Sequence, residues 1–94
     1  GGPIKMPRQS LKVSPIGAKY ENFDFDIKPV VKQFAMKVPG QPSIVINGNR
    51  LNDRAKRLLD LAGNGDTIQI LDVKADVPGT NVPPMPSLLI QITN

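Results

Sequence analysis

The sequence predicts a β-rich α+β fold, an antiparallel sheet or sandwich of about five or six strands with one helix packed on it. Three observations lead to this prediction. Several segments alternate between apolar and polar residues at every second position, as half-buried strands do. One segment alone repeats its apolar residues at helical spacing. Clusters of Gly, Asn and Pro, which favour turns, separate these segments.

The N-terminal residues 1–17 are predicted to be an extended lead-in. Pro3 and Pro7 disfavour a helix there, and residues 11–13 are expected to form a short strand. The lead-in has strand-forming residues but little core of its own. We therefore expect it to pair with a neighbouring domain or protomer rather than to close the sheet of one chain. Residues 18–94 are predicted to form a single β-rich domain.

Three strands are predicted in the first half of this domain. Residues 18–25 form an aromatic-rich strand, and residues 43–46 form a short one that ends at the turn Asn47-Gly48-Asn49. The clearest alternation covers residues 30–38, with Lys32 as the one interruption on the apolar face. The apolar positions of that strand are Val30, Phe34, Met36 and Val38.

The helix is predicted over residues 52–62. Asn52 is expected to cap its N-terminus and Asp53 to favour its dipole, while Gly63-Asn64-Gly65 ends it. A helix this short docks its apolar stripe on a sheet, since it does not persist alone. The stripe consists of Leu51, Ala55, Leu58, Leu59 and Ala62.

The C-terminal third is predicted to contain two more strands. Residues 67–73 and 87–93 both alternate, with Ile at successive positions of one face. Residues 74–87 between them form a Pro-rich loop. Its segment Pro83-Pro84-Met85-Pro86 is either a polyproline ligand or, as we favour, a stiff crossover between strands.

The composition excludes several classes of enzyme. The chain has no His, Cys or Trp, so it cannot form a His-based triad, a thiolate nucleophile, a Cys/His zinc site or a disulfide. Its longest apolar runs are four or five residues, against the ~20 needed to cross a bilayer. Because it begins at Gly1 without a Met or a signal pattern, we expect a fragment of a longer protein.

Charge is distributed unevenly along the chain. The net charge is +4, with +4 over residues 1–49, +3 over residues 50–57 and −3 over residues 58–94. A basic front and an acidic last third fit nucleic-acid binding, and they equally fit a chain that contacts other proteins or copies of itself.

Asp24 and Asp26 are the one carboxylate pair that alternation would place on the same side of a strand, beside Glu21. Such a pair could act as a general acid and base or hold a hard cation. A solvated strand end explains the pair more simply, because two carboxylates at this spacing are common. No catalytic residue, cofactor or metal is therefore predicted.

The candidate partner-contact residues are Asn47, Asn49, Arg50, Arg54 and Arg57. The three arginines are spaced i, i+4 and i+7, opposite or beside the apolar stripe. They indicate either a surface for phosphate or an acidic partner, or an ordinary solvated helix face. Residues 40–94 contain no aromatic for base stacking, which makes nucleic acid the weaker of these interpretations.

Short motifs in a specific order carry a family resemblance that spans nearly the whole chain. They are Gly1-Gly2-Pro3-Ile4, Glu21-Asn22-Phe23-Asp24-Phe25-Asp26, Val31-Lys32-Gln33-Phe34-Ala35-Met36, Asn47-Gly48-Asn49-Arg50-Leu51, Gly65-Asp66-Thr67-Ile68, Asp72-Val73-Lys74-Ala75 and Leu89-Ile90-Gln91-Ile92. In this order the chain resembles the C-terminal domain of the GldM/PorM family, shaft subunits of the type IX secretion and gliding machinery of Bacteroidetes. It departs most in residues 74–87, which puts any ring contact by that loop in doubt.

The resemblance implies a non-enzymatic domain and no catalytic residues. The family's parent protein is a periplasmic homodimer anchored in the inner membrane by an N-terminal helix, where a GldL/PorL-type motor partner binds it. Its distal end meets an outer-membrane-associated ring of GldK/PorK and GldN/PorN type. The alternative that the residues leave open is a small basic binding module for an acidic ligand, nucleic acid or glycan.

Overall fold

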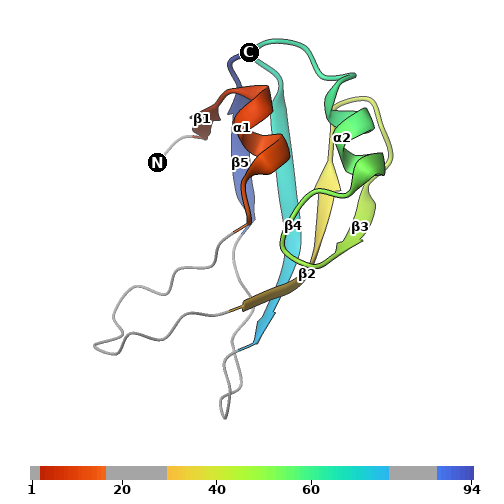
Figure 1. Cartoon of the computed structure of the whole chain (residues 1–94). Coiled ribbons are helices and arrows are strands. Elements are labelled where there is room, and N and C mark those ends of the chain that lie inside the picture. The colour runs from red at the N-terminus through yellow and green to blue at the C-terminus, as the bar shows by residue number, and fades with distance from the viewer. Residues whose placement is uncertain (1–2, 17–29, 77–86) are drawn as a thin grey trace, which may run out of the picture.

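One mixed sheet with two short helices on one face makes up the described part of the protein, residues 3–16, 30–76 and 87–94 of a computed structural model (Figure 1). The predicted β-rich α+β class is confirmed. The strands are β1 (Ile4–Met6), β2 (Val30–Lys37), β3 (Ile44–Asn47), β4 (Thr67–Asp76) and β5 (Leu88–Ile92). The helices are α1 (Arg8–Val13) and α2 (Asp53–Leu59).

The strands lie in the order β1-β5-β4-β2-β3, so β1 and β3 are the two edges of the sheet. Three of the four neighbouring pairs are antiparallel. The fourth pair, β1 with β5, is parallel, with Ile4 opposite Ile90 and Met6 opposite Ile92. The strands nearest the two chain ends therefore meet, which the expectation of an antiparallel sheet did not include.

Both helices cover the same face of the sheet, as Figure 1 shows. Leu11 of α1 and Ala55 and Leu59 of α2 belong to one buried cluster with alternate residues of the strands. The largest fully buried side chains of that cluster are Phe34, Leu11, Met36, Ile46, Leu59, Ile68, Ile70, Ile92 and Val38. Within the described ranges no helix covers the opposite side of the sheet, which we call the open face.

Two bulges change which residues of β2 and β4 face the core. From the pair Val31–Ala75 to the pair Gln33–Lys74, β2 advances two residues and β4 only one, so β2 has one extra residue there. From Gln33–Lys74 to Ala35–Leu71, β4 advances three residues and β2 two, so the second extra residue is on β4. The gain on β2 is Lys32, so Val31 is 4% exposed whereas Val30 is 50% exposed. The expectation that Val30 would be buried, with Lys32 interrupting the apolar face, is therefore wrong.

Within the expected extended lead-in, residues 4–6 are extended as β1, but residues 8–13 form α1, so the short strand expected at 11–13 is wrong. The reason is Pro7, which stands at the N-cap of α1 in an extended conformation. A Pro that precedes the first turn costs a helix no hydrogen bond, because the first N–H groups have no partner within the helix. Leu11, only 1% exposed, then packs into the core. The segment thus closes the sheet of its own chain, and its pairing with another domain or protomer stays a prediction.

Some predictions lie outside the described residues. These are the strand over 18–25 with Asp24 and Asp26, and the proline segment 83–86.

β4 runs to Asp76, three residues beyond its predicted end. In the ranges that the structure describes, neither helix has the length and hydropathy needed to span a membrane.

Candidate interaction surface

The orientation of α2 is fixed by its cap and by its buried stripe. Oδ1 of Asn52 accepts a hydrogen bond from the amide of Ala55 over 2.8 Å, which confirms the predicted N-cap. Leu51, Ala55 and Leu59 are buried against the sheet. The helix is shorter than predicted, because after Leu59 the chain continues in tight turns rather than in α-helical geometry. The opposite side of α2 consequently faces solvent.

The five candidate residues are all exposed and follow one another from the end of β3 to the last turn of α2. Arg50, Arg54 and Arg57, which we call the basic ridge, form no ion pair with any residue in the described ranges. Over residues 50–57 the ridge is accompanied by Lys56 and by a single acid, Asp53. The structure therefore presents a positive surface here, and its role in partner contact stays a prediction.

The two asparagines of the candidate set have structural roles at the end of β3. Oδ1 of Asn47 accepts from Nε2 of Gln33 over 2.9 Å, across the β2–β3 pair. The carbonyl of Asn49 accepts from the amide of Ile16 over 2.6 Å, which attaches the segment after α1 to this turn. Gly48 between them has φ +107°, a value that favours glycine. These bonds hold the start of the ridge in place.

The open face of the sheet carries an apolar centre. By register, Val45, Ala35 and Leu71 lie side by side across β3, β2 and β4. Val45 is 63% exposed. Three of the six large hydrophobic side chains that are exposed in the described residues lie on this face, namely Val30, Val45 and Leu89. Single exposed apolar residues are normal on a protein surface, so the continuous apolar feature here is the short row of Val45, Ala35 and Leu71.

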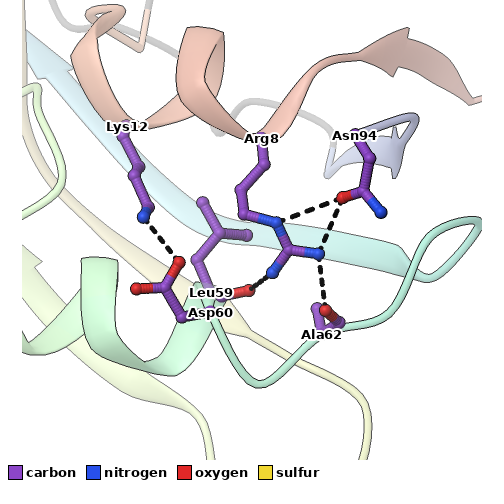
Figure 2. A network of polar contacts seen from close by, with 6 residues as sticks. All are labelled: Arg8, Lys12, Leu59, Asp60, Ala62 and Asn94. Carbon is purple, nitrogen blue, oxygen red and sulfur yellow. Dashed lines mark hydrogen bonds and ion pairs between the residues drawn. The ribbon is translucent and has the colours of Figure 1, made fainter.

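Arg8 joins the N-terminal elements to the end of α2 (Figure 2). Its Nη1 donates to the carbonyl of Leu59 over 2.6 Å, and its Nη2 donates to the carbonyl of Ala62 over 2.7 Å. Nε and Nη2 also donate to Oδ1 of Asn94. The carbonyl of Leu59 also accepts from the amide of Ala62, whereas the carbonyl of Ala62 has Arg8 as its donor among the described residues. One guanidinium therefore connects α1, the end of α2 and the last residue of the chain.

A second contact joins the same two helices. Nζ of Lys12 lies 2.5 Å from Oδ1 of Asp60, directly after α2. Neither Arg8 nor Lys12 was among the predicted site residues. The partners of Arg8 are main-chain carbonyls more than fifty positions away, and no sequence pattern encodes such a pairing.

The described residues offer no group of metal ligands, because nowhere among them do three acidic side chains come together. The surface features of the described residues are exposed arginine guanidiniums, a short apolar row on the open face and the edges of two strands. The carboxylate pair Asp24 and Asp26 lies outside the described residues.

Comparison with known proteins identifies the family. A family model described as the GldM C-terminal domain matches residues 1–93. The comparison with curated proteins finds no match. The match spans nearly the whole chain, and it agrees with the order of motifs from the N-terminal Gly-Gly-Pro-Ile to the last strand. The chain belongs to the GldM C-terminal domain family, a structural domain of the gliding and type IX secretion machinery.

Proposed function

We propose that this domain is the distal periplasmic domain of a dimeric motor shaft, a non-enzymatic part that couples an inner-membrane motor to an outer-membrane-associated ring. The observation that carries the proposal is the family match over residues 1–93. In this arrangement GldK/PorK-type and GldN/PorN-type ring proteins contact the C-terminal region of the parent protein. A GldL/PorL-type partner binds the N-terminal region that precedes this chain.

The connections of the N-terminal elements support a role in transmitting force. A pull that arrives at the start of the domain acts first on β1 and α1. β1 is bonded to β5 over three residue pairs, and α1 is bonded to the end of α2 through Arg8 and Lys12. Such a pull is thus shared between the sheet and both helices rather than carried by one strand.

The basic ridge supports a protein partner of negative charge. Arg50, Arg54 and Arg57 are exposed and have no acidic partner among the described residues. Arginine pairs with carboxylates in a bidentate manner and is enriched at protein interfaces. We therefore assign the ring contact to the ridge.

Paired charge reversals test this assignment. The purified chain and its variant Arg54→Glu/Arg57→Glu are compared in binding to purified ring subunits by biolayer interferometry. The matched control is Lys5→Glu/Lys74→Glu, which changes the charge equally at exposed positions on β1 and β4. We expect the ridge variant to bind at least about tenfold more weakly and the control to bind normally, because charge pairs at an interface are local.

Equal weakening by both variants would contradict the ridge, and no binding by the unmodified chain would contradict the ring contact itself. The alternative function, a basic module for nucleic acid or glycan, makes a different prediction. A labelled oligonucleotide or anionic glycan would then bind through the ridge, and the logarithm of its affinity would fall steeply and linearly with the logarithm of salt concentration.

A further inference from the structure

We infer that the free edge of β3, together with the basic ridge, is a docking site for an extended segment of a partner protein that adds to the sheet as a sixth strand and carries acidic residues at its ends. The inference deepens the proposed function and rests on it for the assignment of the ridge as a contact. It adds the mode of binding and the chemistry of the bound segment.

The edge of β3 has backbone groups available for such a strand. The amide of Gly48 donates to the carbonyl of Lys32 over 2.6 Å, so this opposed pair is a hydrogen-bonded one. Bonded and non-bonded pairs alternate along an antiparallel ladder, and the β2–β3 register is regular. Ile46 and Ile44 therefore bond to β2, whereas Val45 and Asn47 direct their N–H and C=O groups away from it. No backbone group within the described ranges bonds to that side of β3.

The two edges of the sheet differ in how they are protected against added strands. β1 is three residues long, carries Lys5 and is flanked by Pro3 and Pro7. Short length, a lysine and prolines are the devices by which edge strands avoid pairing with other chains. β3, Ile44–Asn47, has no charged residue, no proline and no bulge. Its Val45 is 63% exposed, on the open face. Only the β3 edge is therefore open to strand addition.

The short length of β3 explains why the ridge is needed. Pro42 lies two residues before β3 and Gly48 follows it directly, so an added strand pairs over about four residues and gains few backbone bonds. The chain then passes through Arg50 into α2, which Figure 1 shows in front of β2 and β3. An acidic flank on the added strand would meet Arg50 at this end, and Arg54 and Arg57 follow on α2. Charge complementarity thus adds affinity to the few backbone bonds.

A second copy of the chain fits this edge less well. Two β3 strands paired antiparallel around a two-fold axis would place both α2 helices on the same face of one continuous sheet. Each copy would bring the net +3 charge of residues 50–57 toward the other. Like charges brought together in this way oppose association, so the edge favours a partner with acidic flanks.

The test uses the 94-residue chain and a synthetic probe peptide, Asp-Asp-Thr-Val-Thr-Val-Thr-Asp-Asp. Binding is followed by fluorescence polarisation, and amide hydrogen exchange is followed by NMR. We expect the amides of Val45 and Asn47 to become protected from exchange when the peptide binds. Those of Ile44 and Ile46, already bonded to β2, should change little. A peptide with lysine at the four acidic positions should bind at least about tenfold more weakly.

Variants separate the two parts of the site. Val45→Pro removes one outward N–H and no bond to β2, since proline is tolerated on edge strands, whereas Val45→Thr keeps the backbone donor and the branched shape. We expect about tenfold weaker peptide binding for the proline variant and unchanged binding for the threonine variant. Arg54→Glu/Arg57→Glu should weaken binding similarly, and Lys5→Glu, at the opposite edge, should not.

Several outcomes would overturn the inference. One is unprotected Val45 and Asn47 amides at saturating peptide, a result that does not depend on any variant folding. Another is equal binding by the proline and threonine variants. A third is a doubled mass of the unmodified chain in light scattering that Val45→Pro abolishes, because the occupant of the edge would then be a second copy. Ring binding that survives Val45→Pro, with no peptide binding, would refute the β3 site and leave the proposed function standing.

Discussion

The guanidinium of Arg8 lies 2.6 Å from the carbonyl oxygen of Leu59, at the end of the helix that carries the basic ridge. The two residues are 51 positions apart in the sequence. Because the same guanidinium also reaches Ala62 and Asn94, it joins three parts of the chain that lie far apart in the sequence. The position of the ridge therefore depends on the N-terminal segment of the domain.

Arg8→Ala should lower the stability of the whole domain. The substitution removes the donor of the partly buried carbonyl of Ala62 and one of the two donors of the carbonyl of Leu59. Losing bonds to a charged group costs about 2–3 kcal/mol. In a chain of this size that corresponds to a fall in Tm of roughly 10–20 °C. Urea and thermal unfolding measure the loss. Arg8→Lys should recover only part of it, because an ammonium cannot reach both carbonyls in the planar geometry of a guanidinium.

The matched control is Arg54→Ala, which removes an exposed arginine of α2 that has no ion pair among the described residues. It should change stability by less than about 0.5 kcal/mol. Equal stability of Arg8→Ala and Arg54→Ala would show that the contacts of Arg8 are not energetically important.

Asn52→Ala should destabilise the domain by about 1 kcal/mol, since it removes the side-chain acceptor that caps α2. Asn52→Asp should retain full stability, because a carboxylate accepts the same bond and favours the positive end of the helix dipole. Asn49→Ala serves as the control, since the hydrogen bond at that position is accepted by its main-chain carbonyl and survives the substitution. Chemical denaturation of the three variants compares them. A neutral Asn52→Ala would contradict the assigned cap.

Asp72→Gly should stabilise the domain by about 0.5–1 kcal/mol. Asp72 has φ +50° at the bulge of β4, a conformation that favours glycine and penalises branched side chains. Asp72→Val should therefore destabilise it by about 1–2 kcal/mol. Asp72→Asn, which tolerates the same conformation, should be nearly neutral. Chemical denaturation should give the highest unfolding free energy for Asp72→Gly, an intermediate one for Asp72→Asn and the lowest for Asp72→Val. The reverse order would contradict the left-handed conformation assigned to the bulge.

The sequence allowed the helix and the central strands to be predicted because their burial follows a simple period. The stripe of Leu51, Ala55 and Leu59 and the cap at Asn52 lie where the spacing indicates. The same rule failed at Val30, since a bulge at Lys32 changes the period within the strand. A bulge has no reliable signal in one sequence, as any residue can supply the extra position.

The N-terminal segment was mispredicted for a related reason. Pro7 opposes a helix that would continue through it, but in the structure it stands at the N-cap, before the first turn of α1, where it is tolerated. The parallel pairing of β1 with β5 and the bonds of Arg8 to Leu59 and Ala62 arise from tertiary contacts alone. The exposure of Arg54 and Arg57 followed from helical spacing, whereas Arg50 precedes α2 and the free edge of β3 required the order of the strands.

Leu11→Ala should destabilise the domain by about 2–4 kcal/mol, because Leu11 is 1% exposed within the core formed by the helices and the sheet. Val13→Ala is the control, since Val13 lies two residues further along α1 and is 66% exposed. Deletion of residues 1–13 should have a larger effect, since it removes β1, α1 and Arg8 together. Urea unfolding of the three forms measures the losses. If the deletion left the unfolding free energy unchanged, the segment would not belong to the core of its own chain, and the expectation that it pairs mainly with a neighbouring domain would be restored.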